Sequence, residues 1–143
     1  MCELYNWPMA KSIEIRTVRH CVFNIHVHLV FVTKYRKAVF QQCHYETMAG
    51  IFGKVCGDFE ANLAAIDGEG DHVHLLVNYP PKIAVASLVN SLKGVSSRLL
   101  KQKHPELAKV YWDGALWSPS YFAASCGGAP LEIVKQYIEE QRA

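Results

Sequence analysis

The feature that most constrains the fold is a β-hairpin pattern that stands between two helical patterns. Two short β-type runs, residues 60–67 and 71–79, are split by the sequence Asp67-Gly68-Glu69-Gly70-Asp71. Two glycines in such a stretch favour a tight turn, because glycine adopts positive φ without a steric penalty. Pro80-Pro81 closes the second run. The chain is therefore expected to contain an antiparallel strand pair.

Helical patterns lie on both sides of this hairpin. Apolar residues at spacings of three to five predict an amphipathic helix over 39–59, which Gly57 is expected to end. A second helix is predicted over 84–103 and is stopped by His104-Pro105. A last helix is expected to begin near Pro130, since proline suits the first turn of a helix.

Two further strands complete the pattern. Residues 21–33 are rich in β-branched and aromatic side chains and predict a buried strand, and a short strand is expected at 121–125. The resulting order, β-α-β-β-α-β-α, is the split βαβ pattern with one helix appended. The predicted fold class is α+β: a ferredoxin-like or RRM-like antiparallel sheet with helices on one face and an additional C-terminal helix.

Length and composition limit the class of protein. A chain of 143 residues, half of them hydrophobic, fits one compact domain, predicted over residues 21–143, after an extension of unknown role at 1–20. Five cysteines without a CxxC pair or a secretory signal favour a reduced, cytoplasmic protein. No apolar run is long enough for a membrane anchor. The net charge of +2 does not by itself indicate a nucleic-acid partner.

Two histidines in the predicted strand 71–79 could hold a metal ion. His72 and His74 are two residues apart, so their imidazoles project from the same face at a distance of roughly 6.5–7 Å along the strand. Neutral imidazole is a common ligand of divalent metals. The same spacing is also typical of packed or hydrogen-bonded histidines, and the chain contains a second copy, His26-Val27-His28. Spacing alone does not decide between these interpretations.

The predicted last helix carries a second candidate group. Tyr137 and Gln141 stand one helical turn apart and share a face. A phenol is a weak nucleophile unless a metal activates its target or a neighbour takes its proton. The amide oxygen of Gln141 could serve as a metal ligand. From the residues alone, Tyr137 could equally pack against the sheet.

Basic residues gather locally despite the small net charge. Residues 93–109 contain five basic side chains against Glu106, which gives a local charge of +4. A second basic group follows the first strand at residues 34–37. Such groups can bind phosphates, although a solvated helix face has the same composition. The candidate DNA contacts are Lys34, Tyr35, Arg36, Lys93 and Arg98.

Five motifs, in order along the chain, resemble one known family. They are HCVFNIHVHLVFVTKYRKAVF, GDHVHLLVNYPPK, LVNSLKGVSSRLL, LWSPSYF and EIVKQYIEEQ. Together they are similar to the IS200/IS605 family of single-tyrosine HUH transposases, also called the TnpA type. The resemblance runs from about Cys21 to Gln141, and every motif position that carries chemistry in the family is present.

This resemblance implies a mechanism and a set of partners. In the family, the residues that match His72, His74 and Gln141 bind a divalent ion, Mg²⁺ or Mn²⁺, and the tyrosine that matches Tyr137 attacks the scissile phosphate. The attack gives a 5′-phosphotyrosine and a free 3′-OH, so no nucleotide cofactor is needed. Family members act as homodimers on single-stranded DNA with hairpins near the ends of the element, and many share the active site between subunits.

Two further residues are expected beside this site. Asp71 could orient an imidazole ligand as its neighbour in sequence, and His28 could lie next to the metal because the first and third strands are neighbours in a ferredoxin-like sheet. Two other functions stay open. One is a domesticated endonuclease that nicks hairpin repeats for its host, and the other is a non-catalytic nucleic-acid-binding domain, although the chain lacks an RNP1-like pattern.

Overall fold

The structure, a computed structural model, describes residues 15–125 and 138–139. Its centre is an antiparallel sheet of four strands, in the spatial order β4 (Asn62–Glu69), β5 (His72–Asn78), β3 (His26–Val32) and β6 (Phe122–Ser125). The first and third of these strands in sequence, β3 and β5, are central neighbours. The ferredoxin-like order predicted from the sequence is confirmed.

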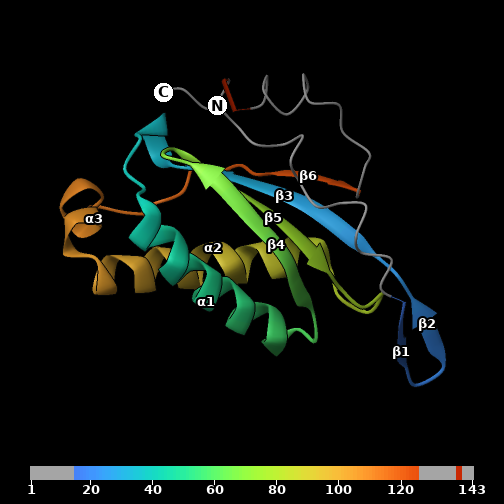
Figure 1. The fold of residues 1–143 in the computed structure, drawn as a ribbon. Helices are drawn as coiled ribbons and strands as arrows, with labels where there is room; N and C mark the ends of the chain where they lie inside the picture. The colour runs from blue at the N-terminus through green and yellow to red at the C-terminus, as the bar shows by residue number, and fades with distance from the viewer. Residues whose placement is uncertain (1–14, 126–137, 140–143) are drawn as a thin grey trace.

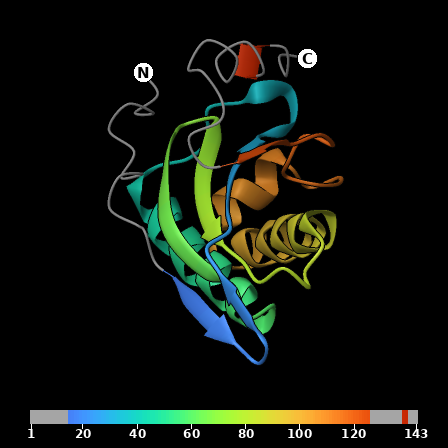
Figure 2. The ribbon, with the colours of Figure 1, turned by 90° about the vertical axis from the view of Figure 1, so that its right-hand side faces the viewer.

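Two long helices, α1 (Gln42–Asp58) and α2 (Val85–Lys103), cover one face of the sheet (Figure 1 and Figure 2). Alternate residues of β5, such as Val73 and Leu75, join the main hydrophobic core beneath these helices. Since successive side chains of a strand point to opposite faces, His72 and His74 belong to the other face of the sheet.

The face opposite α1 and α2 has a small core of its own. Val30 and Val32 of β3 are buried there with Ile138, and Phe122 of β6 packs against them. Ile138 and Glu139 are helical and lie at the C-terminal end of the described chain. They are the residues of the predicted last helix that the structure describes.

The prediction of one continuous strand over residues 21–33 is wrong, because the strand is interrupted between Phe23 and His26. The chain instead forms a separate hairpin, in which β2 (Cys21–Phe23) pairs with β1 (Arg16–Val18), before β3 begins at His26. The Arg16 guanidinium binds Asn78 of β5 and the carbonyl of Glu60. Those contacts hold the hairpin at the end of the sheet, and composition alone could not reveal them. Residues 1–14 of the predicted extension lie outside the described residues.

The roles predicted for the glycines at the end of the first helix and in the hairpin turn need correction. Gly57 lies within α1, which runs to Asp58, and Glu60 takes the left-handed conformation (φ 58°) at the helix end. The hairpin turn consists of Gly70 and Asp71 alone, because β4 extends to Glu69. Gly68 is required by a close approach, since a Cβ there would lie 2.4 Å from the carbonyl oxygen of His72.

The second half of the chain follows the prediction closely. Helix α2 and strand β6 lie within one residue of the expected bounds. A short helix, α3 (Pro105–Val110), was not predicted; it begins at the proline that was expected only to stop α2. Within the described residues, no helix combines the length and apolar character that crossing a membrane requires.

Candidate active site

Three histidines meet on the face of the sheet opposite the long helices. His72 and His74 lie on β5, with ring centroids 4.9 Å apart, and His28 lies on the neighbouring strand β3, 5.5 Å from His74 by the same measure. All three side chains are buried. The face predicted to bind a metal therefore contains a compact imidazole cluster to which both His-Val-His motifs contribute.

The His72 imidazole is held in one tautomer by its neighbour in sequence. Nδ1 lies 2.6 Å from Oδ1 of Asp71, so Nδ1 carries the proton and donates it to the carboxylate. Nε2 then keeps a lone pair that can bind a ligand. That atom is buried and has no hydrogen-bond partner within the described part of the chain. A buried unpaired nitrogen is costly, and a metal ion is the kind of partner that removes this cost.

The other two imidazoles are held neutral by their surroundings. Burial, together with repulsion from positive charge on His72 and His28, lowers the pKa of His74 to about 2. Burial also lowers the pKa of His28 to about 4. Nε2 of His28 lies 3.4 Å from Nδ1 of His74. Neutral imidazoles at physiological pH are what a divalent metal site needs.

Arg36 connects the histidine strand to the C-terminal segment. Its Nε donates to Oδ2 of Asp71 at 2.7 Å, and its Nη1 lies 3.0 Å from Oε1 of Glu139. Burial would raise the pKa of Asp71, but the hydrogen bonds from His72 and Arg36 lower it to about 2. Tyr35 and Arg36 both adopt left-handed φ, of 65° and 53°, which is strained for these residue types. The contacts of Arg36 with the two carboxylates therefore occur on a strained segment of backbone.

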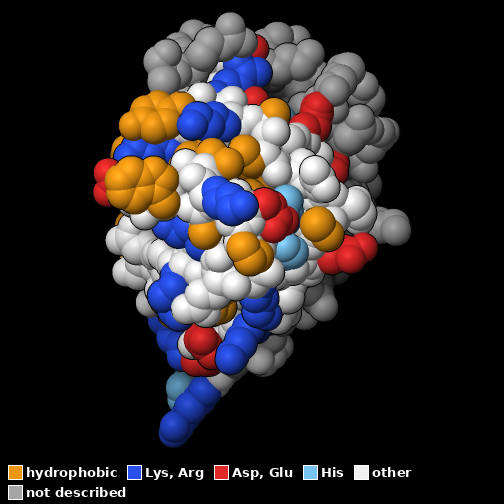
Figure 3. Space-filling view, turned by 90° about the vertical axis from the view of Figure 1, so that its left-hand side faces the viewer, with side chains coloured by type: hydrophobic (Ala, Val, Ile, Leu, Met, Phe, Trp, Pro, Cys, Tyr) orange, Lys and Arg blue, Asp and Glu red, His pale blue; other side chains and the backbone are white. Residues whose placement is uncertain are grey.

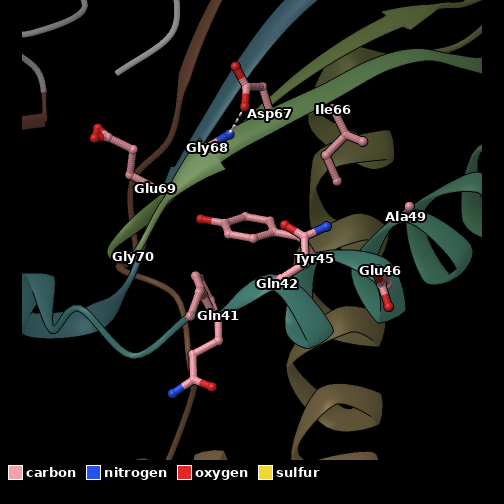
Figure 4. Close-up of a pocket in the computed structure, with 11 residues that line it drawn as sticks. Gln41, Gln42, Tyr45, Glu46, Ala49, Ile66, Asp67, Gly68, Glu69 and Gly70 are labelled. Atoms are coloured by element: carbon pink, nitrogen blue, oxygen red, sulfur yellow. Dashed lines mark hydrogen bonds between the residues drawn. The ribbon is translucent and has the colours of Figure 1, made fainter. Parts of the chain in front are cut away.

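A tyrosine of α1 supports the same strand from the other face. The Tyr45 hydroxyl donates to the backbone carbonyl of His72 at 2.9 Å. Figure 4 shows Tyr45 reaching from α1 toward the end of β4, in a pocket between the two elements. Asp67 and Glu69 of β4 pair with His74 and His72 and so project to the histidine face. The two carboxylates add negative charge beside the imidazole cluster.

Two of the predicted site residues cannot be placed. Tyr137 and Gln141 lie outside the described residues. Ile138 and Glu139, which stand between them in the sequence, contact Val30, Val32 and Arg36. The described part of the C-terminal segment thus packs on the same face of the sheet as His72 and His74.

The family comparison decides what kind of protein carries this cluster. The family model described as "Transposase IS200 like" matches residues 21–141. The chain belongs to the IS200-like transposase family. The ISDra2 transposase TnpA of Deinococcus radiodurans is 29% identical over 129 residues, which cover 90% of this chain and 92% of that protein. The transposase of insertion sequence IS200 from Salmonella typhimurium is 28% identical over 130 residues, 89% and 86% of the two chains.

Solved structures extend the likeness to the fold. A candidate transposase from Deinococcus radiodurans R1 superimposes with a TM-score of 0.78 at 30% identity, over 90% of this chain and 98% of that one. A REP-associated tyrosine transposase bound to a REP hairpin superimposes with a TM-score of 0.52 at 11% identity, over 87% and 68%. The second likeness shows the fold alone.

The predicted DNA contacts of this IS200-like transposase lie in different surroundings. Tyr35 is 55% exposed, with the Lys34 and Lys37 ammonium groups over its ring. Arg98 is exposed and lines a pocket of about 550 Å³ with Lys34. Figure 3 shows basic and hydrophobic side chains interleaved on the face at the α3 end. These side chains are available to a ligand.

Lys93 and Arg36 are engaged within the protein. The Lys93 ammonium donates to three consecutive carbonyls, of Ser118, Pro119 and Ser120, at 2.7–3.2 Å. Burial lowers the pKa of Lys93. Lys93 therefore holds the loop that leads to β6, and Arg36 bridges Asp71 and Glu139. No local pattern in the sequence marks Tyr45 or Glu139 as part of the site, because their partners are 27 residues or more away in the chain.

Proposed function

We propose that this transposase cleaves and rejoins single-stranded DNA at insertion-sequence ends through a 5′-phosphotyrosine intermediate, with a divalent metal ion. The observation that carries the proposal is the His72 imidazole. Its Nδ1 is fixed by Asp71 and its buried Nε2 has no partner within the described residues. That arrangement supports a metal ligand better than a packed core histidine, in which both nitrogens would have hydrogen-bond partners.

The residues fit a divalent cation, and the family resemblance favours Mg²⁺ or Mn²⁺. His72 and His74 would supply nitrogen ligands, Gln141 an oxygen, and open positions would remain for phosphate and water. When bound, the ion supplies a Lewis acid that polarises the scissile phosphate. Asp71 holds the His72 tautomer, and Arg36 holds Asp71.

Tyr137 is the proposed nucleophile. Its phenol oxygen forms a bond to phosphorus while the bond from phosphorus to the 3′ oxygen breaks, so the DNA leaves with a free 3′-OH and the phenol loses its proton. The phosphotyrosine conserves the energy of the phosphodiester. Attack by the 3′-OH of another strand then reverses the step without ATP.

The proposed substrate is single-stranded DNA with hairpins near the element ends, and the active unit is a homodimer whose active site can be shared. A structural neighbour with the same fold is bound to a REP hairpin. On this chain, Tyr35 can stack on an unpaired base while Lys34 and Arg98 bind phosphates. The exposed Tyr35 and Arg98 and the half-buried Lys34 support a DNA surface between the end of β3 and α2.

The test is adduct formation on labelled single-stranded DNA that carries the element end. The wild-type chain is incubated with and without Mg²⁺ and run on a denaturing gel beside Tyr137→Phe. An SDS-resistant adduct that requires Mg²⁺ and is absent from Tyr137→Phe is the expected result. The variant should bind the hairpin as the wild type does, because only the nucleophilic oxygen is removed.

Two results would overturn the proposal. An adduct of undiminished yield in Tyr137→Phe would assign the nucleophile to another residue. Tight hairpin binding by the wild type without an adduct, on an end that carries the cleavage site, would favour a binding protein. Tyr79→Phe is the matched control for a tyrosine substitution, and it should form the adduct normally.

A further inference from the structure

A second cluster of metal-ligating side chains lies away from the sheet histidines. Cys43 and His44 stand in the first turn of α1, and His104 and Glu106 stand at the junction of α2 and α3. One ligand atom from each residue lies within 4.8 Å of the others. Figure 3, which views the molecule from the α3 end, shows histidine and acidic side chains side by side on the surface. The cluster uses none of the residues of the proposed active site.

The hydrogen bonds of His44 exclude it as a metal ligand. Its Nδ1 accepts the backbone N–H of Gln41 at 2.9 Å, so the neutral ring carries its proton on Nε2. That N–H donates to Oε2 of Glu106 at 2.8 Å. A metal at Nε2 would require a proton on Nδ1, directed at the Gln41 N–H. His44, which is buried, therefore orients the carboxylate of Glu106.

His104 has the same tautomer as His44 but turns its other nitrogen, Nδ1, toward Glu106. Its Nε2 lies 2.8 Å from the Thr47 hydroxyl, which itself donates to the carbonyl of Cys43. Nε2 is therefore the donor and Nδ1 keeps its lone pair. That Nδ1 lies 3.6 Å from Oε2 of Glu106. Two acceptor atoms that face each other at this distance repel unless a cation or a proton lies between them.

The distance between Nδ1 of His104 and Oε2 of Glu106 suits a zinc ion. Zn–N and Zn–O bonds of about 2.0–2.2 Å place two ligands of a tetrahedral zinc ion roughly 3.3–3.6 Å apart. The exposed thiol of Cys43 provides a third ligand of the soft type that zinc favours. Glu106 and Cys43 are exposed, so water can occupy the fourth position.

We propose that Cys43, His104 and Glu106 form a zinc-class metal site, with His44 as the positioning residue for Glu106. The bound ion connects the first turn of α1 to the α2–α3 junction. Because both helices cover the same face of the sheet, the ion acts as a clamp on the helical layer. It is independent of the divalent ion proposed for the sheet histidines.

Cobalt is the direct probe of this site. The full chain is freed of metal with a chelator and titrated with Co²⁺, whose bond to a thiolate gives a charge-transfer absorption in the near ultraviolet and strong visible bands when the ion is tetrahedral. We expect one equivalent of Co²⁺ to produce these bands and Zn²⁺ to remove them by displacement. The sheet histidines contribute no sulfur, so this signal reports the helical site alone.

Four variants assign the ligands. Cys43→Ser should abolish the charge-transfer band, and Cys21→Ser, the matched control at another surface-accessible cysteine, should retain it. His104→Gln should weaken Co²⁺ binding more than about tenfold, since even outer-sphere partners of a metal contribute 10–100-fold. His44→Gln should retain the band at reduced affinity. Circular dichroism without metal checks that each variant is folded.

Four outcomes would overturn the assignment. The site is absent if the wild type gives no charge-transfer band with Co²⁺. It is elsewhere if the band survives in Cys43→Ser or if His104→Gln binds Co²⁺ as tightly as the wild type. His44 is a ligand, against the proposal, if His44→Gln loses the band as completely as Cys43→Ser.

Discussion

The chain contains the tripeptide His-Val-His twice, on neighbouring strands of one sheet and facing the same side. Residues 72–74 lie on β5 and residues 26–28 lie on β3, and the two strands run antiparallel. His28 lies beside His74, whereas His26 pairs with Asn78 at the opposite end of β5 from His72. Identical sequence and identical secondary structure therefore give two different environments.

The difference comes from the residue that precedes each motif. Asp71 precedes His72 and fixes its tautomer, and Arg36 fixes Asp71 in turn. Ile25 precedes His26 and offers no side-chain acceptor; its backbone carbonyl accepts the N–H of Tyr79. The spacing of two histidines determines which face they share, and the neighbouring carboxylate of Asp71 fixes the His72 tautomer that the proposed metal site needs.

The largest expected effect separates the two motifs directly. His72→Ala should lower the rate of metal-dependent DNA cleavage by more than about 100-fold, because a direct ligand counts for more than an outer-sphere partner. His26→Ala should stay within about twofold of the wild type, as is usual for substitutions away from a site. Rates are measured under single-turnover conditions with excess Mg²⁺. An equal loss in the two variants would remove the distinction between the motifs.

The next largest effect concerns the carboxylate beside the β5 motif. Asp71→Asn should weaken the apparent affinity for Mn²⁺ by 10–100-fold, since the amide no longer fixes the His72 tautomer. The matched control is Asp67→Asn, on the same face but bonded to the Gly68 N–H. Titration of cleavage activity with Mn²⁺ gives both affinities. If Asp67→Asn were the more damaging of the two, the role given to Asp71 would be wrong.

Arg36 allows a test between two roles, a bridge and a DNA contact. Lysine keeps the charge but cannot bind two carboxylates with separate N–H groups, so Arg36→Lys should lower kcat about tenfold, the equivalent of about 1.4 kcal/mol. The KM for DNA and its salt dependence should not change. A raised KM with an unchanged kcat would instead make Arg36 a phosphate contact.

The smallest expected effect is that of the tyrosine behind β5. Tyr45→Phe removes the hydrogen bond to the His72 carbonyl and should lower the free energy of unfolding by about 1 kcal/mol. Tyr35→Phe, at an exposed position, should change it by less than about 0.5 kcal/mol. Urea denaturation measures both. Equal stabilities for the two variants would show that the Tyr45 bond does not hold the strand.

Most of the fold could be predicted from local patterns. Helix α2 has apolar residues at regular helical spacing and a proline two residues after its end, and the structure agrees within one residue. The predicted bounds of strands and turns are wrong where a contact between distant segments determines the local structure. The break at Asn24 depends on the hairpin that Arg16 ties to Asn78, and the short turn at Gly70 depends on pairing of Glu69 with His72.

The residues of the candidate site also fall into two groups, those with a local sequence signal and those whose contacts join distant segments. His72 and His74 were accessible to sequence analysis because their spacing is local, and Asp71 because it is adjacent. Tyr45 and Glu139 were not, because their contacts with the site join segments far apart in the chain. The pairing of Cys43 with His104 is of the same kind, since only the packing of α1 against α2 brings them together.

The central claim is that the β5 motif and not the β3 motif holds the catalytic metal. Its most direct test is Mn²⁺ binding by electron paramagnetic resonance, without DNA, to His72→Gln and His26→Gln side by side. We expect His72→Gln to lose Mn²⁺ affinity by more than about 100-fold and His26→Gln to bind Mn²⁺ as the wild type does. Loss of Mn²⁺ binding in His26→Gln, with binding retained in His72→Gln, would contradict the claim.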